Sequence, residues 1–161
     1  MRINCIPVEH LTDQHLRAEW VEMLMLPVFM KRSLKAKGYL DIDESIDYKL
    51  NTGHARFFYN KLKYVENRYK EIESEMKLRY FKANPSLDLS MFPKELFNDW
   101  IPTKKDIVIN TNRILTRIKE KPLWYTFFGF VGGFSFDEWV GFYEGWIDFK
   151  YELKDSDLKR G

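Results

Sequence analysis

The sequence predicts an all-α fold in a single domain. Four segments carry helical sequence patterns, and no stretch alternates apolar and polar residues clearly enough to predict a strand. A chain of 161 residues is long enough for one domain with a hydrophobic core and short for two. The net charge is only +2, but an acidic excess after residue 130 leaves the rest of the chain basic. This distribution is consistent with a body that faces nucleic acid and an acidic appendage.

The first helix should follow a short extended arm. Residues 1–11 contain Pro7 and show no helical period, whereas Thr12 is a residue type that caps the helix it precedes. One arc of this helix is apolar and should face the core: Leu16, Trp20, Met23 and Leu24. The other arc is polar or small: Gln14, His15, Ala18, Glu19 and Glu22. Pro27 should break or kink the helix, and its continuation should stop at Gly38.

A central helix should come next. Residues 39–52 lack a sustained period and are rich in acidic residues, so they predict a loop. Residues 53–81 carry apolar side chains at helical spacing without an internal Gly or Pro, which predicts one long helix. Residues 82–102 should form a connector with one short turn after Pro93.

Two further helices complete the prediction. Thr103 and Asp106 form a pattern like a capping box, which should start a helix that Pro122 ends. From there to Phe134 the chain is aromatic and interrupted by glycines, so it cannot be regular helix throughout. Ser135 has a glutamate three residues later and should start a fourth helix. The aromatic face of this helix should pack on the body or on a second copy: Trp139, Phe142, Tyr143, Trp146 and Ile147.

Several classes of protein are disfavoured. Cys5 is the only cysteine, which excludes an intramolecular disulfide, and without a signal peptide we expect a cytoplasmic protein. The longest apolar stretch, residues 122–136, is interrupted by glycines and falls short of the ~20 residues of a membrane helix, so we expect no membrane partner. His15, Glu19 and Glu22 on one helix are a weak metal pattern, so we expect no metal and no cofactor.

Four blocks of the sequence match a known family in order and spacing: MRIN, LTDQHLRAEWVE, LNTGHARFFYNKL, and the run from FPKELFNDWIP to KPLWYTFFG. Together they resemble the phage endonuclease V family, which are pyrimidine-dimer DNA glycosylases and AP lyases. The resemblance implies a domain over residues 1–130, with three main helices and an N-terminal arm threaded between them. It leaves residues 131–161 as an acidic, aromatic C-terminal extension, packed on that domain or at the interface of a homodimer.

The resemblance also implies a DNA repair activity on double-stranded DNA that contains a lesion, most often a UV pyrimidine dimer. The family's nucleophile is the α-amine of the first residue, which is Met1 here. The pKa of an α-amine is about 7.7–8.0, so part of it is the free base at neutral pH. Its attack on C1′ expels the base and gives an imine, and β-elimination then cleaves the strand. Glu22 matches the catalytic glutamate, and a carboxylate suits both the stabilisation of the imine and the proton transfer.

The remaining site residues follow from the same matching. Arg2, Gln14 and His15 correspond to polar groups of the active site. The expected DNA contacts are Lys31, Arg32, Arg56, Arg113, Arg117, Lys121, Trp124 and Tyr125.

The chain also departs from the family pattern. Met1 stands where the family has a threonine, and basic residues are missing at Val21 and near Val28, which should weaken phosphate binding. The alternative function is therefore a catalytically altered module on the same scaffold that binds DNA or protein.

Overall fold

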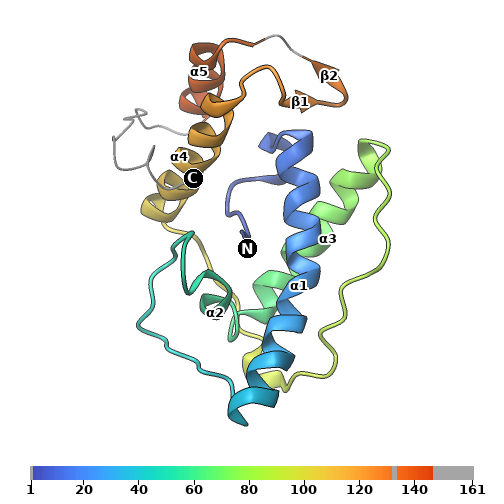
Figure 1. Ribbon diagram of the computed structural model, residues 1–161, viewed down its shortest axis with the longest axis vertical. Coiled ribbons are helices and arrows are strands. Elements are labelled where there is room, and N and C mark those ends of the chain that lie inside the picture. The colour runs from blue at the N-terminus through green and yellow to red at the C-terminus, as the bar shows by residue number, and fades with distance from the viewer. Residues whose placement is uncertain (1, 132–133, 147–161) are drawn as a thin grey trace.

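The computed structural model describes residues 2–131 and 134–146 of the chain (Figure 1). The elements are α1 (Asp13–Lys37), α2 (His54–Phe57), α3 (Leu62–Leu78), α4 (Lys104–Glu120) and α5 (Phe136–Trp146), with 3₁₀ turns at Val8–His10 and Lys94–Leu96, and two short strands, β1 (Thr126–Phe127) and β2 (Phe130–Val131). The predicted all-α class is confirmed. The turn predicted after Pro93 is also present, and residues 39–52 contain no helix, as predicted.

The arm at the start of the chain lies between α1 and α4, and α3 packs behind α1 (Figure 1). The apolar residues of the arm belong to the main core, where Ile3, Ile6 and Leu11 are completely buried. The path of the arm through the interior places the first described residue, Arg2, beside the middle of α1.

Helix α1 begins and ends as predicted. The Thr12 hydroxyl accepts the His15 amide, and Gly38 ends the helix in the left-handed conformation, with φ of 77°. The predicted break at Pro27 is wrong, because one helix runs through it. Pro27 and its neighbours on the inner face are buried, so core packing offsets the hydrogen bond that proline cannot make: Met23, Leu26 and Met30.

The prediction of one long central helix is wrong. Residues 58–61 separate α2 from α3, and Lys61 bridges to Phe97 at this point. Phe57, Phe58 and Tyr59 are consecutive and all buried. Consecutive side chains on a helix point about 100° apart, so three in a row would span both of its faces. The turn lets all three aromatic rings reach the core.

Helix α4 shows both hydrogen bonds of the predicted capping box. The Thr103 hydroxyl accepts the Asp106 amide, and the Asp106 carboxylate accepts the Thr103 amide at 2.8 Å. Helix α5 packs on α4, and Ser135, the residue before it, makes the predicted capping contacts with Glu138. The Tyr143 hydroxyl of α5 donates to the His10 carbonyl at 2.8 Å. Of the predicted aromatic face, Trp139 and Tyr143 are buried, whereas Ile147 lies outside the described residues.

The segment between α4 and α5 contains a hairpin that the sequence did not predict, with Phe128 and Gly129 at its turn. Both have positive φ, 51° and 75°, as a two-residue hairpin turn of this twist requires. Asp13 anchors the hairpin to α1, because its carboxylate accepts the Thr126 hydroxyl and the Phe128 and Gly129 amides. The same carboxylate pairs with buried Arg79 at 3.0 Å.

Within the described part of the chain, no helix is long and apolar enough to span a membrane.

Candidate active site

The arm is held by side chains rather than by a strand. Five consecutive amides, from residue 2 to residue 6, donate to side-chain acceptors: Arg2 to Glu22, Ile3 to His54 Nε2 at 2.6 Å, Asn4 to Glu19 at 3.0 Å, and Cys5 and Ile6 to Asn110 Oδ1 at 2.8 and 3.3 Å. The acceptors come from α1, α2 and α4. An extended segment with no strand partner thereby has its buried amides satisfied and its register fixed.

A buried ion pair supports these contacts to the arm. Glu19 is 1% exposed and receives two hydrogen bonds from Arg68 of α3, at 2.9 and 3.1 Å. Arg68 also donates to the Ile6 carbonyl at 2.6 Å, and the Asn4 side chain donates to Glu19 at 2.6 Å. Since the charge of Glu19 is paired and its oxygens are occupied, this carboxylate serves the structure of the arm.

Glu22 lies one helical turn further along α1 and faces the beginning of the arm. It is half-buried, and its carboxylate accepts the Arg2 amide. Burial raises the pKa of Glu22 above its usual value, although the Arg2 amide and guanidinium oppose this effect. Glu22 therefore exchanges its proton closer to neutral pH than an exposed glutamate does.

A small cavity of about 30 Å³ opens beside Glu22, with room for one or two water molecules. It brings together four of the predicted site residues with Glu22: Arg2, His15, Arg113 and Arg117. Two acids, Glu22 and the already paired Glu19, line this cavity together with three guanidinium groups, a type of group that binds phosphate oxygens.

His15 lines this cavity as a neutral ring. Its Nδ1 lies 2.7 Å from the Thr12 hydroxyl, and its ring stacks on Tyr125 with centroids 4.8 Å apart. Burial, together with the charges of Arg2 and Arg117, lowers the pKa of His15 to about 3. An imidazolium is therefore not available there at neutral pH. Tyr125 is itself buried and packs against His15.

Gln14 holds the hairpin beside the site. Its side chain donates to the Trp124 carbonyl at 3.0 Å and accepts the Thr126 amide at 3.0 Å. Trp124 is 58% exposed and lines a cleft of about 470 Å³ together with Glu22 and Val21. Gln14 thus places an exposed aromatic ring next to the carboxylate.

A family model described as pyrimidine dimer DNA glycosylase matches residues 1–89, which is more than half of the chain. The chain belongs to the pyrimidine dimer DNA glycosylase family. The family resemblance is confirmed over residues 1–89, which contain the first three of the four sequence blocks. The protein is an enzyme of DNA repair, a glycosylase of a family that acts on DNA containing a lesion. The matched range contains the arm, Glu22, Glu19, His54 and Arg68.

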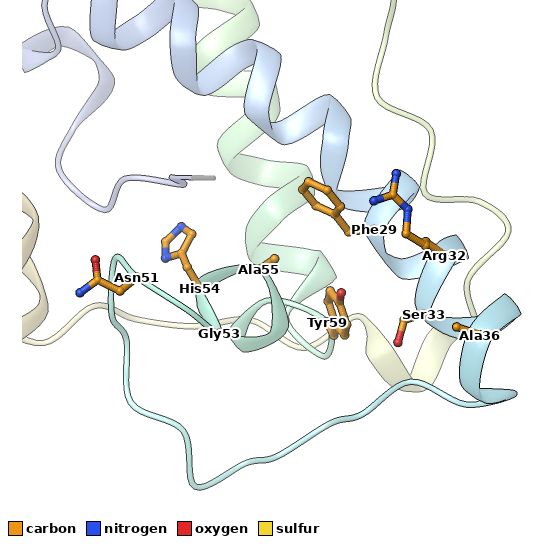
Figure 2. Close-up of a pocket in the computed structure, with 9 residues that line it drawn as sticks. All are labelled: Phe29, Arg32, Ser33, Ala36, Asn51, Gly53, His54, Ala55 and Tyr59. Carbon is orange, nitrogen blue, oxygen red and sulfur yellow. The ribbon is translucent and has the colours of Figure 1, made fainter. Parts of the chain in front are cut away.

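Other predicted DNA contacts of the glycosylase lie outside the Glu22 cavity. Lys31 and Arg32 are exposed on the second half of α1, where Arg32 lines a separate cleft of about 500 Å³ (Figure 2). Arg56 pairs with Asp41 at 2.8 Å. Lys121 is exposed at the end of α4. Met1 lies outside the described residues.

Sequence reasoning missed three residues that hold the arm of the glycosylase: His54, Arg68 and Asn110. Asn110 had no distinct signal, because Thr111, Asn112 and Arg113 follow it and it is one of several polar residues in the third predicted helix. Arg68 had none, since it sits among many charged residues of the central helix. The described residues contain no group of three or more side chains that could hold a metal ion.

Proposed function

We propose that this glycosylase is also an AP lyase that uses the α-amine of Met1 as its nucleophile and Glu22 as its proton-transfer group. The observation that carries the proposal is the hydrogen bond from the Arg2 amide to the Glu22 carboxylate. The α-nitrogen of residue 1 is three covalent bonds from that amide nitrogen, and the bond lengths and angles keep the two nitrogens less than about 4 Å apart. The amine of residue 1 is thus tethered close to Glu22.

The proposed reaction begins at C1′ of the damaged nucleotide. The amine forms a bond to C1′ as the bond from C1′ to the base breaks, and the base leaves with the electron pair and takes up a proton. The amine then loses a proton, the C1′–O4′ bond opens and O4′ is protonated, which leaves a positively charged imine at C1′. In this proposal the ionised Glu22 carboxylate stabilises that charge.

Strand cleavage follows from the imine. Glu22 accepts a proton from C2′, and the C3′–O bond breaks with its electron pair going to the departing phosphate. Water then hydrolyses the imine and frees the amine. The raised pKa of Glu22 suits a group that must take up and return a proton in each turnover.

The three arginines of the cavity supply the binding part of the proposal. Arg2, Arg113 and Arg117 surround Glu22, and guanidinium groups bind phosphate oxygens in pairs. We propose that they hold the phosphates that flank the scissile sugar and that Arg32, Lys31 and Lys121 follow the backbone further away. The exposed Trp124 is the proposed contact to the lesion.

Borohydride trapping tests the proposal. Untagged protein is incubated with duplex DNA that carries a pyrimidine dimer or an abasic site, and borohydride reduces the imine to a stable link. We expect an adduct that peptide mass spectrometry maps to Met1, and no adduct from protein with an acetylated N-terminus. Intact-mass measurement first verifies a free N-terminus. If verified protein forms no adduct on either DNA, the lyase proposal is wrong.

The second candidate is a module that binds DNA or protein without the chemistry. It is favoured by Val21, which is 52% exposed beside Glu22 and provides no charge for a phosphate. The trapping experiment separates the two candidates, because a binding module forms no covalent adduct. Affinity for DNA that depends on salt would then distinguish a DNA-binding module from a protein-binding one.

A further inference from the structure

His54 is the acceptor nearest to the beginning of the arm after Glu22. It is 2% exposed and is the first residue of α2, and its ring points toward the arm (Figure 2). Nε2 lies 2.6 Å from the Ile3 amide nitrogen, and Nδ1 lies 2.6 Å from the Lys49 carbonyl oxygen. The rings of Tyr48 and Phe58 meet it edge-on, with centroids 5.6 and 5.2 Å away. The ring is therefore held on all sides in one orientation.

These two contacts allow a single protonation state. The Lys49 carbonyl only accepts, so Nδ1 must carry a hydrogen, and the Ile3 amide only donates, so Nε2 must be bare. Only the neutral ring with its hydrogen on Nδ1 meets both conditions. A protonated ring, or the other tautomer, would turn a hydrogen toward the Ile3 amide.

The position of this acceptor matters for the start of the chain. Successive amides of an extended segment point in opposite directions, and here Glu22 takes the Arg2 amide while His54 takes the Ile3 amide. The arm is thus held at residues 2 and 3 by hydrogen bonds to Glu22 on one side and to His54 on the other. Ile3 is completely buried, so an unpaired amide there would lack water as a replacement.

We infer that His54, in its Nδ1–H tautomer, is a positioning residue for the reaction, which fixes the amine of residue 1 against Glu22 through the Ile3 amide. The inference rests on the proposed function, since it assigns His54 a role toward the Met1 amine. His54 itself touches no reacting atom. Its contribution is to stop the first residues of the arm from moving away from the carboxylate while DNA is bound.

The first test needs no variant. Two-bond ¹⁵N–¹H correlation spectra of the histidine rings report which nitrogen carries the hydrogen. At neutral pH we expect His54 of the native protein to be the Nδ1–H tautomer, with Nε2 showing the shift of a bare, hydrogen-bonded nitrogen. An Nε2–H tautomer, or a positively charged ring, overturns the inference whatever the variants do.

The second test compares two substitutions. His54→Phe keeps a ring of similar size but removes the acceptor, whereas His54→Gln offers an amide oxygen near the position of Nε2. We expect the rate of borohydride trapping on abasic DNA to fall about tenfold or more in His54→Phe and to recover largely in His54→Gln, with DNA affinity unchanged in both. His10→Phe is the matched control, because its ring packs on Trp146 of α5 with centroids 4.2 Å apart.

The outcomes separate this inference from the proposed function. If native protein forms no adduct, the lyase proposal fails, and the tautomer measurement still decides how His54 holds the arm. If native protein is trapped and His54→Phe is trapped at the same rate, the positioning role is wrong. Equal losses in His54→Phe and His54→Gln, in protein that is folded by circular dichroism, also contradict it, because the acceptor would then be irrelevant.

Discussion

Glu22 and Glu19 show how one helical turn separates two chemical roles. Glu19 is buried and paired with Arg68, so its charge is permanently compensated. Glu22 is half-buried and accepts the Arg2 amide, and within the described residues no arginine or lysine is paired with it as Arg68 is with Glu19. A carboxylate that must change its protonation state during a reaction needs the second environment.

Replacement of Glu22 by Gln tests its role directly. The amide keeps the size of the side chain but can neither stabilise the imine charge nor take the proton from C2′. We expect strand cleavage to fall about 10²-fold to 10⁴-fold, with DNA binding unchanged. A gel assay on DNA with an abasic site measures the first quantity, and fluorescence anisotropy measures the second. Glu44→Gln, in the exposed loop, should cleave like the native protein.

The buried histidine predicts how stability depends on pH. Burial lowers the pKa of His54 to about 4, while the pKa of an unfolded histidine is about 6.5. Between these values the unfolded chain binds more protons than the folded chain, so the free energy of unfolding should fall as pH is lowered from about 6.5 toward 4. Urea unfolding at a series of pH values measures this slope. His54→Gln should show a shallower slope between pH 6.5 and 5, and an unchanged slope would contradict the assignment.

The sequence was informative about Glu22 and uninformative about its surroundings. Glu22 was assigned because the first two sequence blocks resemble those of the family, and its catalytic role stays a prediction. The pairing of Glu19 with Arg68 joins residues 49 positions apart, and the contact of Asn110 with Cys5 joins residues 105 apart. No periodicity within one segment carries such information, and this is why the residues that hold the arm emerged only from the structure.

At the scale of elements, the hairpin depends on one carboxylate at the start of α1. Burial alone would raise the pKa of Asp13, but hydrogen bonds from Thr126, Gly129 and Arg79 lower it below its usual value. The Asp13 carboxylate is thus ionised, and both of its oxygens accept hydrogen bonds. It joins the hairpin, α1 and the end of α3 at one point.

Replacement of Asp13 by Ala should loosen that junction. Arg79 would lose one of its buried partners and the hairpin would lose three acceptor contacts, so we expect a loss of about 3 kcal/mol or more in the free energy of unfolding. Urea denaturation measures it. Asp47→Ala, at a side chain that is 88% exposed, is the matched control and should change stability by less than about 0.5 kcal/mol. A loss as small as that of the control would show that the hairpin is held elsewhere.

Elements with local signals were predicted well and elements shaped by tertiary packing were not. The capping box of α4 depends on Thr103 and Asp106, three residues apart, and the sequence located it correctly. The turn at residues 58–61 lets the adjacent rings of Phe57 and Phe58 both meet Tyr48 and Trp100, of which Trp100 lies more than 40 residues away in the sequence. Helical periodicity continues across that turn and so concealed it.

At the scale of the molecule, the proposed DNA-facing surface has a small number of cations. Three arginines line the cavity beside Glu22, of which Arg117 also pairs with Glu120 at 3.1 Å, whereas Arg56 pairs with Asp41 and Val21 contributes no charge. The net charge of +2 adds little long-range attraction. Affinity for undamaged DNA should therefore be modest and sensitive to single charges near the site.

An added charge at Val21 tests this view. Val21 is exposed in the cleft that Trp124 and Glu22 line, so Val21→Arg places a guanidinium within reach of the backbone. We expect tighter binding to duplex DNA and a salt dependence steeper by about 0.9 in the logarithmic slope. Arg117→Ala should make the slope shallower by a similar amount, and Arg56→Ala should change it less. Titrations at several salt concentrations measure the slopes, and identical slopes for all variants would refute the proposed DNA-facing surface.

The anchoring of the arm also has a consequence for protein synthesis. A ribosome produces residues 2–6 first, but their acceptor His54 follows Ile3 by 51 residues and Asn110 follows Cys5 by 105. Until α4 has been made, the Cys5 and Ile6 amides lack their acceptor, Asn110. The acceptors of the arm are therefore complete only after most of the domain has been synthesised, so the segment made first is among the last to reach its final hydrogen bonds.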